Sequence, residues 1–153
     1  MRVIAGSAKG KSLQAPAGWE TTRPTADKVK EAIFGSIQFE LEGSRVLDLF
    51  AGSGALGIEA LSRGAAQAVL VDASREAVRA IQANLAYTGL AERAEVLPMD
   101  YARALARLHA PFDFIFLDPP YRSDLYAAAI AGSHARGLLA AEGLIIVEHA
   151  GQF

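Results

Sequence analysis

The sequence predicts an α/β fold with a Rossmann-like, doubly wound and mostly parallel sheet. From Arg45 onward, short apolar runs alternate with segments of helical periodicity, and the runs leave no polar face. Strands that are apolar on both faces and alternate with helices are typical of a parallel sheet covered on both sides by right-handed crossovers. The 153 residues, 52% of them hydrophobic, suffice for one domain with its own core. We therefore expect a single domain over residues 1–153, with an N-terminal basic extension (1–42) and a Rossmann-like core (43–153).

The N-terminal extension is predicted to contain a short β-hairpin and one helix. Residues 2–13 have the pattern of a strand pair that turns around residues 8–10, and a loop rich in Pro and Gly follows. Thr25 is the predicted N-cap of a helix over residues 26–41. The expected buried face of that helix consists of Val29, Ala32, Ile33, Ile37 and Leu41.

The core is predicted to continue as strands that alternate with helices. The expected strands cover residues 46–50, 68–72, 94–97, 112–117 and 144–147. The expected helices cover residues 56–63, 75–87 and about 101–108, and a further helix begins near residue 124. Ser74 stands where an N-cap is expected, and Gly64 and Gly89 stand where helices are expected to end.

The net charge of −2 conceals a basic N-terminus. The first thirty residues carry a net charge of +4, which leaves −6 for the remainder of the chain. The basic residues there are Arg2, Lys9, Lys11, Arg23, Lys28 and Lys30. A basic end joined to an acidic body is typical of a protein that meets phosphates at one edge. A solvated N-terminal arm would explain the charge alone equally well.

The composition argues against several classes of protein. The absence of Cys removes disulfides and thiolate metal sites, and we expect a cytoplasmic protein. The chain starts too weakly apolar for a signal sequence, and Glu142 interrupts the longest apolar stretch, so no membrane association is expected. The three His residues lack ligand spacing, and acidic residues without further oxygen ligands in one loop do not predict a metal site.

Acidic residues fall at the ends of successive predicted strands. They are Asp48, Asp72, Asp100 and Asp118, each at or just after the end of one of the first four core strands. In an open parallel sheet, ligands bind outside the carboxyl ends of the strands. We therefore expect these four side chains to converge on one crevice.

A glycine motif, G-x-G-x-x-G over residues 52–57, lies between the first core strand and its helix. Such a motif places backbone N–H groups and a helix N-terminus against a ligand, but it serves dinucleotides and adenosyl ligands alike. Asp72, twenty residues after Gly52, fits an acid that accepts hydrogen bonds from ribose hydroxyls.

Asp48 separates these two ligand classes. A carboxylate just before the glycine turn would repel a pyrophosphate and attract the ammonium and sulfonium groups of S-adenosylmethionine, since unit charges about 4 Å apart interact by about 4 kcal/mol at an effective dielectric near 20. The electrostatics therefore favour the sulfonium ligand. Asp48 could instead cap the loop that it precedes, and Asp100 is equally well explained by adenine recognition or by helix capping.

The turn Asp118-Pro119-Pro120-Tyr121 is the most specific signal in the sequence. Two prolines after a buried strand fix the backbone and cannot donate to a β-ladder. A carboxylate oxygen of Asp118 and the carbonyl of Pro119 could accept both protons of a base amino group and aim its lone pair at a methyl carbon. Tyr121 could stack on the base. An ordinary surface turn is the alternative.

The residues quoted so far resemble the bacterial 16S ribosomal RNA guanine-N2 methyltransferases of the RsmD type. The resemblance runs nearly end to end, over residues 2–6, 9–11, 23–27, 30–34, 48–65, 72 and 113–121. The glycine loop and the Asp-Pro-Pro-Tyr turn are shared by many amino-group methyltransferases. The Arg23-Pro24-Thr25 block and the segment from Ser62 to Ala65 are more particular to this family.

The resemblance implies the fold of class I S-adenosylmethionine-dependent methyltransferases and methylation of N2 of one guanine in small-subunit RNA. The implied catalytic residues are Asp118, Pro119, Pro120 and Tyr121. The implied residues around S-adenosyl-L-methionine are Asp48, Phe50, Ala51, Gly52, Gly54, Asp72, Ala73, Asp100 and Tyr101. The implied RNA-binding residues are Arg2, Lys9, Lys11, Arg23, Lys28 and Arg122.

Two departures limit the resemblance. Gly35 stands where relatives usually have Asn, which puts any polar contact there in doubt, and the chain stops at Phe153, where relatives usually continue into a further strand. A missing strand would leave an exposed sheet edge, so we expect a monomer with weak self-association through that edge. Two other functions stay open: amino-methylation of adenine or of DNA, and a nicotinamide-dependent oxidoreductase or non-catalytic nucleotide binder.

Overall fold

A computed structural model of the chain describes residues 1–18, 26–109, 111–117, 128–130, 132 and 137–147. Within them lies a parallel sheet of five strands in the order β3-β2-β1-β4-β5. The strands are β1 (Arg45–Asp48), β2 (Gln67–Val71), β3 (Ala94–Leu97), β4 (Phe112–Leu117) and β5 (Leu139–Val147). The chain winds outward from β1 to β3 and then returns to place β4 on the other side of β1. The predicted doubly wound α/β fold is therefore confirmed, with its topological switch point between β1 and β4.

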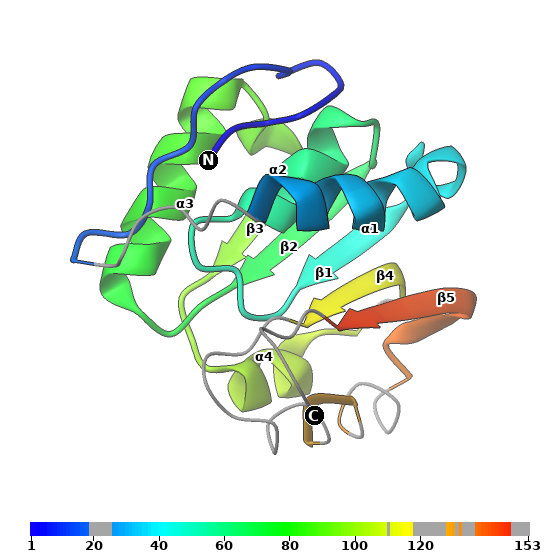
Figure 1. The fold of residues 1–153 in the computed structure, drawn as a ribbon. Helices are drawn as coiled ribbons and strands as arrows, with labels where there is room; N and C mark the ends of the chain where they lie inside the picture. Colours follow the sequence, from blue (N-terminus) through cyan, green and yellow to red (C-terminus); the bar gives the residue numbers. More distant parts are fainter. Residues whose placement is uncertain (19–25, 110, 118–127, 131, 133–136, 148–153) are drawn as a thin grey trace.

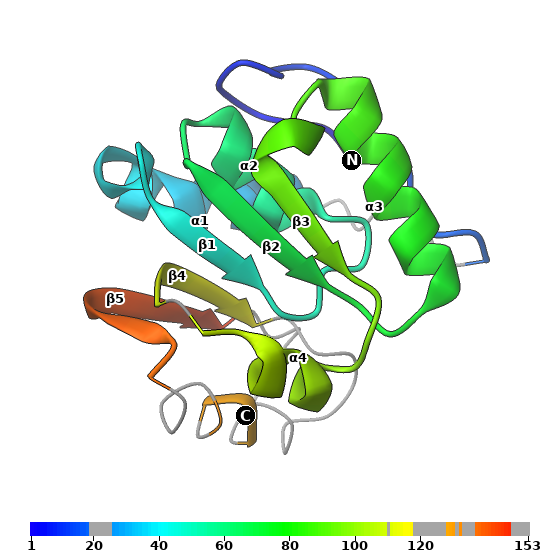
Figure 2. The ribbon, with the colours of Figure 1, turned by 180° about the vertical axis from the view of Figure 1, so that it is seen from behind.

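Helices cover both faces of this sheet (Figures 1 and 2). The helices α1 (Ala26–Leu41), α2 (Ala55–Ser62) and α3 (Arg75–Thr88) lie on one face, and α4 (Tyr101–Arg107) lies on the other. A short 3-10 helix, η1 (Ala91–Arg93), leads into β3. None of the described helices is long and apolar enough to cross a membrane.

Successive side chains of each strand point to opposite faces of the sheet, so they pack into two separate hydrophobic cores. Val46, Leu70 and Phe116 join the core beneath α1, α2 and α3. Leu47 and Ile115 join the core beneath α4. Because β1 and β2 are buried on both faces, their sequences show no polar alternation.

The described helix boundaries and caps agree closely with the prediction. The helix α1 has the predicted bounds, although its expected cap, Thr25, lies outside the described residues. The Ser74 side chain accepts a hydrogen bond from the Ala77 amide, and Gly89 ends α3 with a positive φ of 73°. Gly64 follows the last cap residue of α2, and the helix predicted from about residue 124 begins outside the described residues.

Two details of the prediction were wrong, namely the buried face of α1 and the start of the last strand. Ala32 is exposed, while the unpredicted Phe34 is fully buried in α1 and packs its ring against Phe116, with the ring centroids 5.6 Å apart. The predicted short N-terminal hairpin, by contrast, is present: an antiparallel bridge joins Arg2 and Ser12, and the Val3 and Leu13 amides donate to the carbonyls of Lys11 and Met1 on the facing segment. The last strand begins five residues earlier than predicted, at Leu139, and its pairing with β4 shifts register where Glu142 and Gly143 interrupt the apolar pattern.

Candidate functional site

The glycine loop, residues 49–54, leaves the end of β1 at the switch point of the sheet. The Leu49 amide donates to the Phe116 carbonyl at 3.2 Å, and the Ala51 amide donates to the Val71 carbonyl at 2.8 Å, so the loop stays tied to both neighbouring strands. Gly52 and Gly54 have positive φ angles of 59° and 85°, a conformation that favours glycine. The loop is therefore held in one shape at the carboxyl edge of the sheet.

Asp72 lies directly beside this loop. One of its carboxylate oxygens accepts a hydrogen bond from the Gly52 amide at 2.9 Å, and the other accepts from the Ser74 amide at 2.9 Å. The side chain is only half-buried. Because each carboxylate oxygen offers two lone pairs, Asp72 keeps acceptor capacity for ligand hydroxyls while it holds the loop.

Asp48 is buried beneath the same loop, with 1% of its surface exposed. Its Oδ2 accepts a hydrogen bond from the Gly57 amide at 3.1 Å, in the first turn of α2. Gly54, the N-cap residue of α2, has no side chain that could make such a bond. The capping role considered for Asp48 is thus present in the structure, and its role toward a cofactor stays a prediction.

The third glycine of the motif allows the helix to approach the sheet closely. A Cβ on Gly57 would lie 2.9 Å from Leu70 Cδ2 on β2 and 3.5 Å from Oδ2 of Asp48. A larger residue at position 57 would therefore require the end of the Leu70 side chain to shift. Glycine lets the N-terminus of α2 lie close to β2 without that shift.

An aromatic pair lies near the glycine loop, in the part of the core beneath α4. The rings of Phe50 and Tyr101 lie with their centroids 5.4 Å apart and a 44° angle between their planes. Both were expected near the cofactor, and both are half-buried. The Asp100 side chain accepts from the Arg103 amide at 2.9 Å, so the capping interpretation of Asp100 is confirmed, and Ala73 is exposed beside Asp72.

The predicted catalytic turn comes directly after β4 in the sequence. Leu117 ends β4, whose residue Phe116 pairs with Asp48 in the parallel ladder. Asp118, Pro119, Pro120 and Tyr121 lie outside the described residues, as do the predicted RNA contacts Arg23 and Arg122. The described chain therefore brings the cofactor candidates together and ends β4 beside them.

The predicted RNA-binding residues that the structure describes are all exposed: Arg2, Lys9 and Lys11 on the N-terminal arm (residues 1–18), and Lys28 on α1. Lys30, which also contributes to the basic charge of this region, is buried, with 4% of its surface exposed. Its Nζ lies 3.2 Å from a carboxylate oxygen of Glu59. The cationic surface is therefore smaller by one charge than the sequence suggested.

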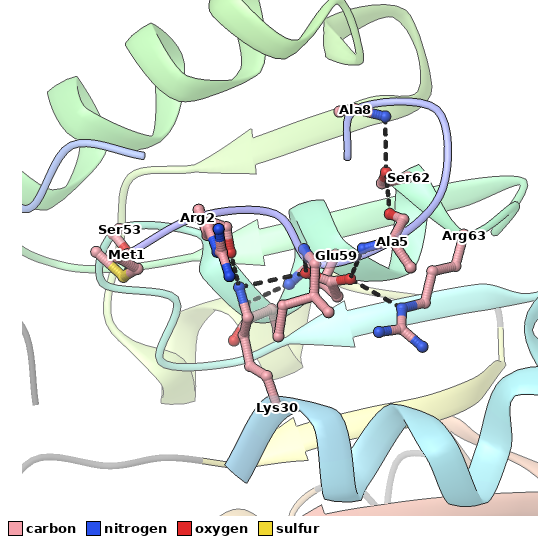
Figure 3. A network of polar contacts seen from close by, with 12 residues as sticks. Met1, Arg2, Ala5, Ala8, Lys30, Ser53, Glu59, Ser62 and Arg63 are labelled. Carbon is pink, nitrogen blue, oxygen red and sulfur yellow. Dashed lines mark hydrogen bonds and ion pairs between the residues drawn. The ribbon is translucent and has the colours of Figure 1, made fainter. Parts of the chain in front are cut away.

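Glu59 is a structural residue that the sequence analysis missed (Figure 3). Its carboxylate accepts from the Ile4 amide at 2.9 Å and from the Ala5 amide at 3.1 Å, and it pairs with Arg63 at 2.8 Å as well as with Lys30. Glu59 is completely buried. A Glu within the otherwise apolar run of α2 was the available signal, because such a charge stays buried only when it is paired.

Ser62 and Gly6 complete the attachment of the N-terminal arm to α2. The Ser62 hydroxyl donates to the Ala5 carbonyl at 2.6 Å and accepts from the Ala8 amide at 2.9 Å. The Ser7 amide donates to the Ser62 carbonyl at 2.8 Å. A Cβ on Gly6 would lie 1.9 Å from that carbonyl oxygen, so only glycine fits there.

Asn84, on α3, joins the arm to the glycine loop and was also missed. Its Oδ1 accepts from the Gln14 amide at 2.8 Å. Its Nδ2 donates to the Gln14 carbonyl at 3.0 Å and to the Ser53 carbonyl at 2.9 Å. Asn84 is 1% exposed, so the arm, α3 and the loop meet at one buried amide.

Among the residues that the structure describes, no three His, Cys, Asp or Glu side chains gather as metal ligands. The carboxylates at the sheet edge are instead engaged by backbone N–H groups, as the bonds of Asp48, Asp72 and Asp100 show. His109 is exposed after α4.

Comparison with known proteins gives the family. Residues 1–152 match a family described as Conserved hypothetical protein 95. The chain belongs to this family. Ribosomal RNA small subunit methyltransferase D of Escherichia coli is 39% identical over 148 residues, which cover 97% of this chain and 74% of that protein. YlbH of Bacillus subtilis, a candidate rRNA methyltransferase by name, is 47% identical over 152 residues, which cover 97% of this chain and 82% of that one.

A solved structure of a similar protein has the same fold. The chain superimposes on the candidate methyltransferase yhhF of Escherichia coli with a TM-score of 0.87 and 38% identity, covering 96% of this chain and 80% of that one. The methyltransferase fold expected from the sequence is thereby confirmed, as is the family suggested by the resemblance.

Proposed function

We propose that this protein transfers a methyl group from S-adenosylmethionine to N2 of a guanine in small-subunit ribosomal RNA. The observation that carries the proposal is the contact between Asp72 and Gly52 at the carboxyl edge of the sheet. The contact supports the proposal because it joins Asp72 to the glycine loop at the edge of the sheet where parallel sheets bind ligands. The relatives named as ribosomal RNA methyltransferases support the same substrate class, and the reaction would take place in the cytoplasm.

The described residues fit S-adenosylmethionine in charge and shape. Asp48 beneath the glycine loop and Asp72 beside it supply negative charge, which suits a cationic ligand and not a pyrophosphate. Gly52, half-buried and with a left-handed φ, has no side chain that would stand between its backbone and a ligand. Phe50 and Tyr101 offer an apolar wall of the kind that an adenine ring requires. When bound, the cofactor supplies an activated methyl group on a sulfonium sulfur.

The residues of the catalytic turn would prepare the acceptor nitrogen. An exocyclic amino group is a poor nucleophile because its lone pair is delocalised into the base. Asp118 and the Pro119 carbonyl would accept hydrogen bonds from its two N–H groups and so favour a pyramidal nitrogen with its lone pair directed outward. As the nitrogen gains the methyl group, the carbon–sulfur bond would break to leave S-adenosylhomocysteine, and the Asp118 carboxylate would take up the one proton that the methylated nitrogen loses. Tyr121 would stack on the base after it leaves its neighbours in the RNA. Positioning and charge supply the catalysis, and no covalent intermediate with the protein is required.

The basic residues of the N-terminal region would hold the RNA. Arg2, Lys9, Lys11 and Lys28 are exposed, and Arg23 and Arg122 are assigned here from the sequence. Phosphate contacts of this kind fix the position of a nucleic acid but do not read its sequence. The choice of guanine therefore depends on the crevice and the catalytic turn.

The proposal is tested by offering labelled S-adenosylmethionine with bare small-subunit RNA, assembled small subunits and duplex DNA, and identifying the labelled nucleoside. N2-methylguanine in RNA supports the proposal. Label in N6-methyladenine or in DNA supports the alternative amino-methyltransferase instead. Calorimetry tests the cofactor, because S-adenosylhomocysteine should bind and NADH should not, and the reverse result would contradict a methyltransferase.

A further inference from the structure

Tyr87 is an exposed aromatic residue near the end of α3. The N-terminal arm passes close to this helix (Figures 1 and 2). Its side chain keeps 59% of its surface exposed. Lys11 of the arm reaches it, with Nζ 5.0 Å from the ring centroid and 3.2 Å from the Tyr87 carbonyl oxygen. A cation and an open aromatic surface thus lie side by side, although they come from segments 76 residues apart.

A shallow hollow of about 250 Å³ adjoins this pair. It is lined by Ser12, Leu13, Gln14, Asn84 and Tyr87. Pockets for complete small-molecule ligands usually measure about 300–1,000 Å³, so a smaller and open hollow suits a single flat group. The buried side chain of Asn84 fixes part of the lining of this hollow, because it makes hydrogen bonds to both the backbone N–H and the backbone carbonyl of Gln14.

Asn84 connects the hollow to the glycine loop. Asn84 also donates to the Ser53 carbonyl in the glycine loop, and the Ser53 hydroxyl lies 3.4 Å from the Met1 sulfur. A group bound in the hollow would therefore be separated by the Asn84 side chain from the glycine loop, which is assigned to the cofactor. The hollow is therefore well placed for a second contact with a substrate that extends from the glycine loop to the hollow.

We propose that Tyr87 and Lys11 hold an unpaired nucleotide of the RNA substrate, distinct from the base that is methylated. The assignment rests on the proposed function. Aromatic side chains stack on single-stranded bases of any sequence, and neighbouring cations meet the phosphates. The ammonium of Lys11 keeps two further N–H donors for a phosphate beyond the one directed at the Tyr87 carbonyl. A protein partner fits less well, because charged residues are depleted at the centre of protein interfaces and Lys11 lies against the ring.

Substitution of Tyr87 measures the stacking contact. Tyr87→Ala should weaken binding of small-subunit RNA about 5- to 150-fold, the equivalent of about 1–3 kcal/mol per stacked base. Tyr87→Phe retains the ring and should bind within about twofold of the wild type. Phe39→Ala is the matched control, since Phe39 is 93% exposed on α1, on the far side of α2 from α3 (Figure 1). Affinity for S-adenosylhomocysteine should be unchanged in all three variants.

Photocrosslinking identifies the partner directly. A benzophenone side chain introduced in place of Tyr87, irradiated with small subunits, should give an adduct that ribonuclease destroys. An adduct to a ribosomal protein, or no adduct, would overturn the assignment. Unchanged RNA binding by Tyr87→Ala, or equal losses in Tyr87→Ala and Tyr87→Phe, would overturn it as well. If the wild type transfers methyl groups to RNA while Tyr87→Ala binds normally, only this site fails; a wild type that methylates no RNA contradicts the proposed function itself.

Discussion

The carboxylate of Asp72 accepts a hydrogen bond from the Gly52 amide at 2.9 Å, across a separation of 20 residues. This contact joins the end of β2 to the loop after β1. It therefore fixes the distance between the two elements that are assigned to the cofactor.

Replacing Asp72 should weaken cofactor binding. In Asp72→Asn, the charged acceptor for the ribose hydroxyls is lost, so affinity for S-adenosylhomocysteine should fall about 10- to 150-fold, as measured by calorimetry. Asp113→Asn is a suitable control, because Asp113 also accepts a backbone hydrogen bond, from the Arg45 amide at 2.9 Å, but at the opposite edge of the sheet. Equal affinities in the two variants would remove Asp72 from the cofactor site.

Replacing Asp118 should separate catalysis from binding. We expect Asp118→Ala to abolish methyl transfer and to leave cofactor affinity within about tenfold, because its carboxylate acts on the amine in the transition state. Labelled transfer and calorimetry on the same preparation check both statements. A joint loss of transfer and cofactor affinity would mean that Asp118 holds the cofactor.

The exposed lysines of the arm should determine the salt dependence of RNA binding. In the double variant Lys9→Ala with Lys11→Ala, the slope of log affinity against log salt should become smaller in magnitude by about 1.4 to 1.8. Arg103→Ala with Arg107→Ala removes two exposed cations from α4, on the other face of the sheet, and serves as the control. An unaltered slope in the lysine variant would exclude the arm from RNA binding.

Glu59 should contribute strongly to stability. Glu59→Gln leaves Lys30 buried without its counter-charge, so the free energy of unfolding should fall by about 3–5 kcal/mol in chemical denaturation. Glu40→Gln, an exposed position on α1, should change it by no more than about 0.5 kcal/mol. Similar results for both variants would show that the buried network adds no stability.

Gly6 and Gly10 form a matched pair for testing how the arm is attached. Both have positive φ angles, of 90° and 87°, but a Cβ would collide with the Ser62 carbonyl only at Gly6 and would meet nothing within 4 Å at Gly10. Gly6→Ala should therefore detach the arm and accelerate amide exchange at Ser7 and Ala8 by about tenfold more than Gly10→Ala does. Equal exchange in both variants would mean that backbone strain alone governs this turn.

The elements of the core were predictable because their patterns are local. The strands β1 and β2 are buried on both faces and so appear as unbroken apolar runs, and Ser74 and Gly89 mark the ends of α3 by their own chemistry. The convergence of Asp48, Asp72 and the glycine loop followed from the rule that parallel strands end at one edge.

The contacts of the N-terminal arm were not predictable in the same way. Glu59 contacts residues 54 and 55 positions away, and Asn84 contacts Gln14 across 70 positions. The periodicity of a sequence does not indicate which residues far apart along the chain will contact one another. An Asn near the end of an amphipathic helix has the pattern of a surface residue. Lys30 was assigned to the basic surface for the same reason, since its partner lies on another helix.

The helix α2 is buried from Leu56 through Ser62, so it has no side that faces water. The sheet covers one side of it, and the arm covers the side of Glu59 and Ser62. Removing the first fourteen residues would uncover a charged and a hydroxyl group amid apolar neighbours, and would also release Asn84 from Gln14. Shortened forms that lack the arm should therefore precipitate on expression. The arm thus contributes to the solubility of the folded chain by covering α2.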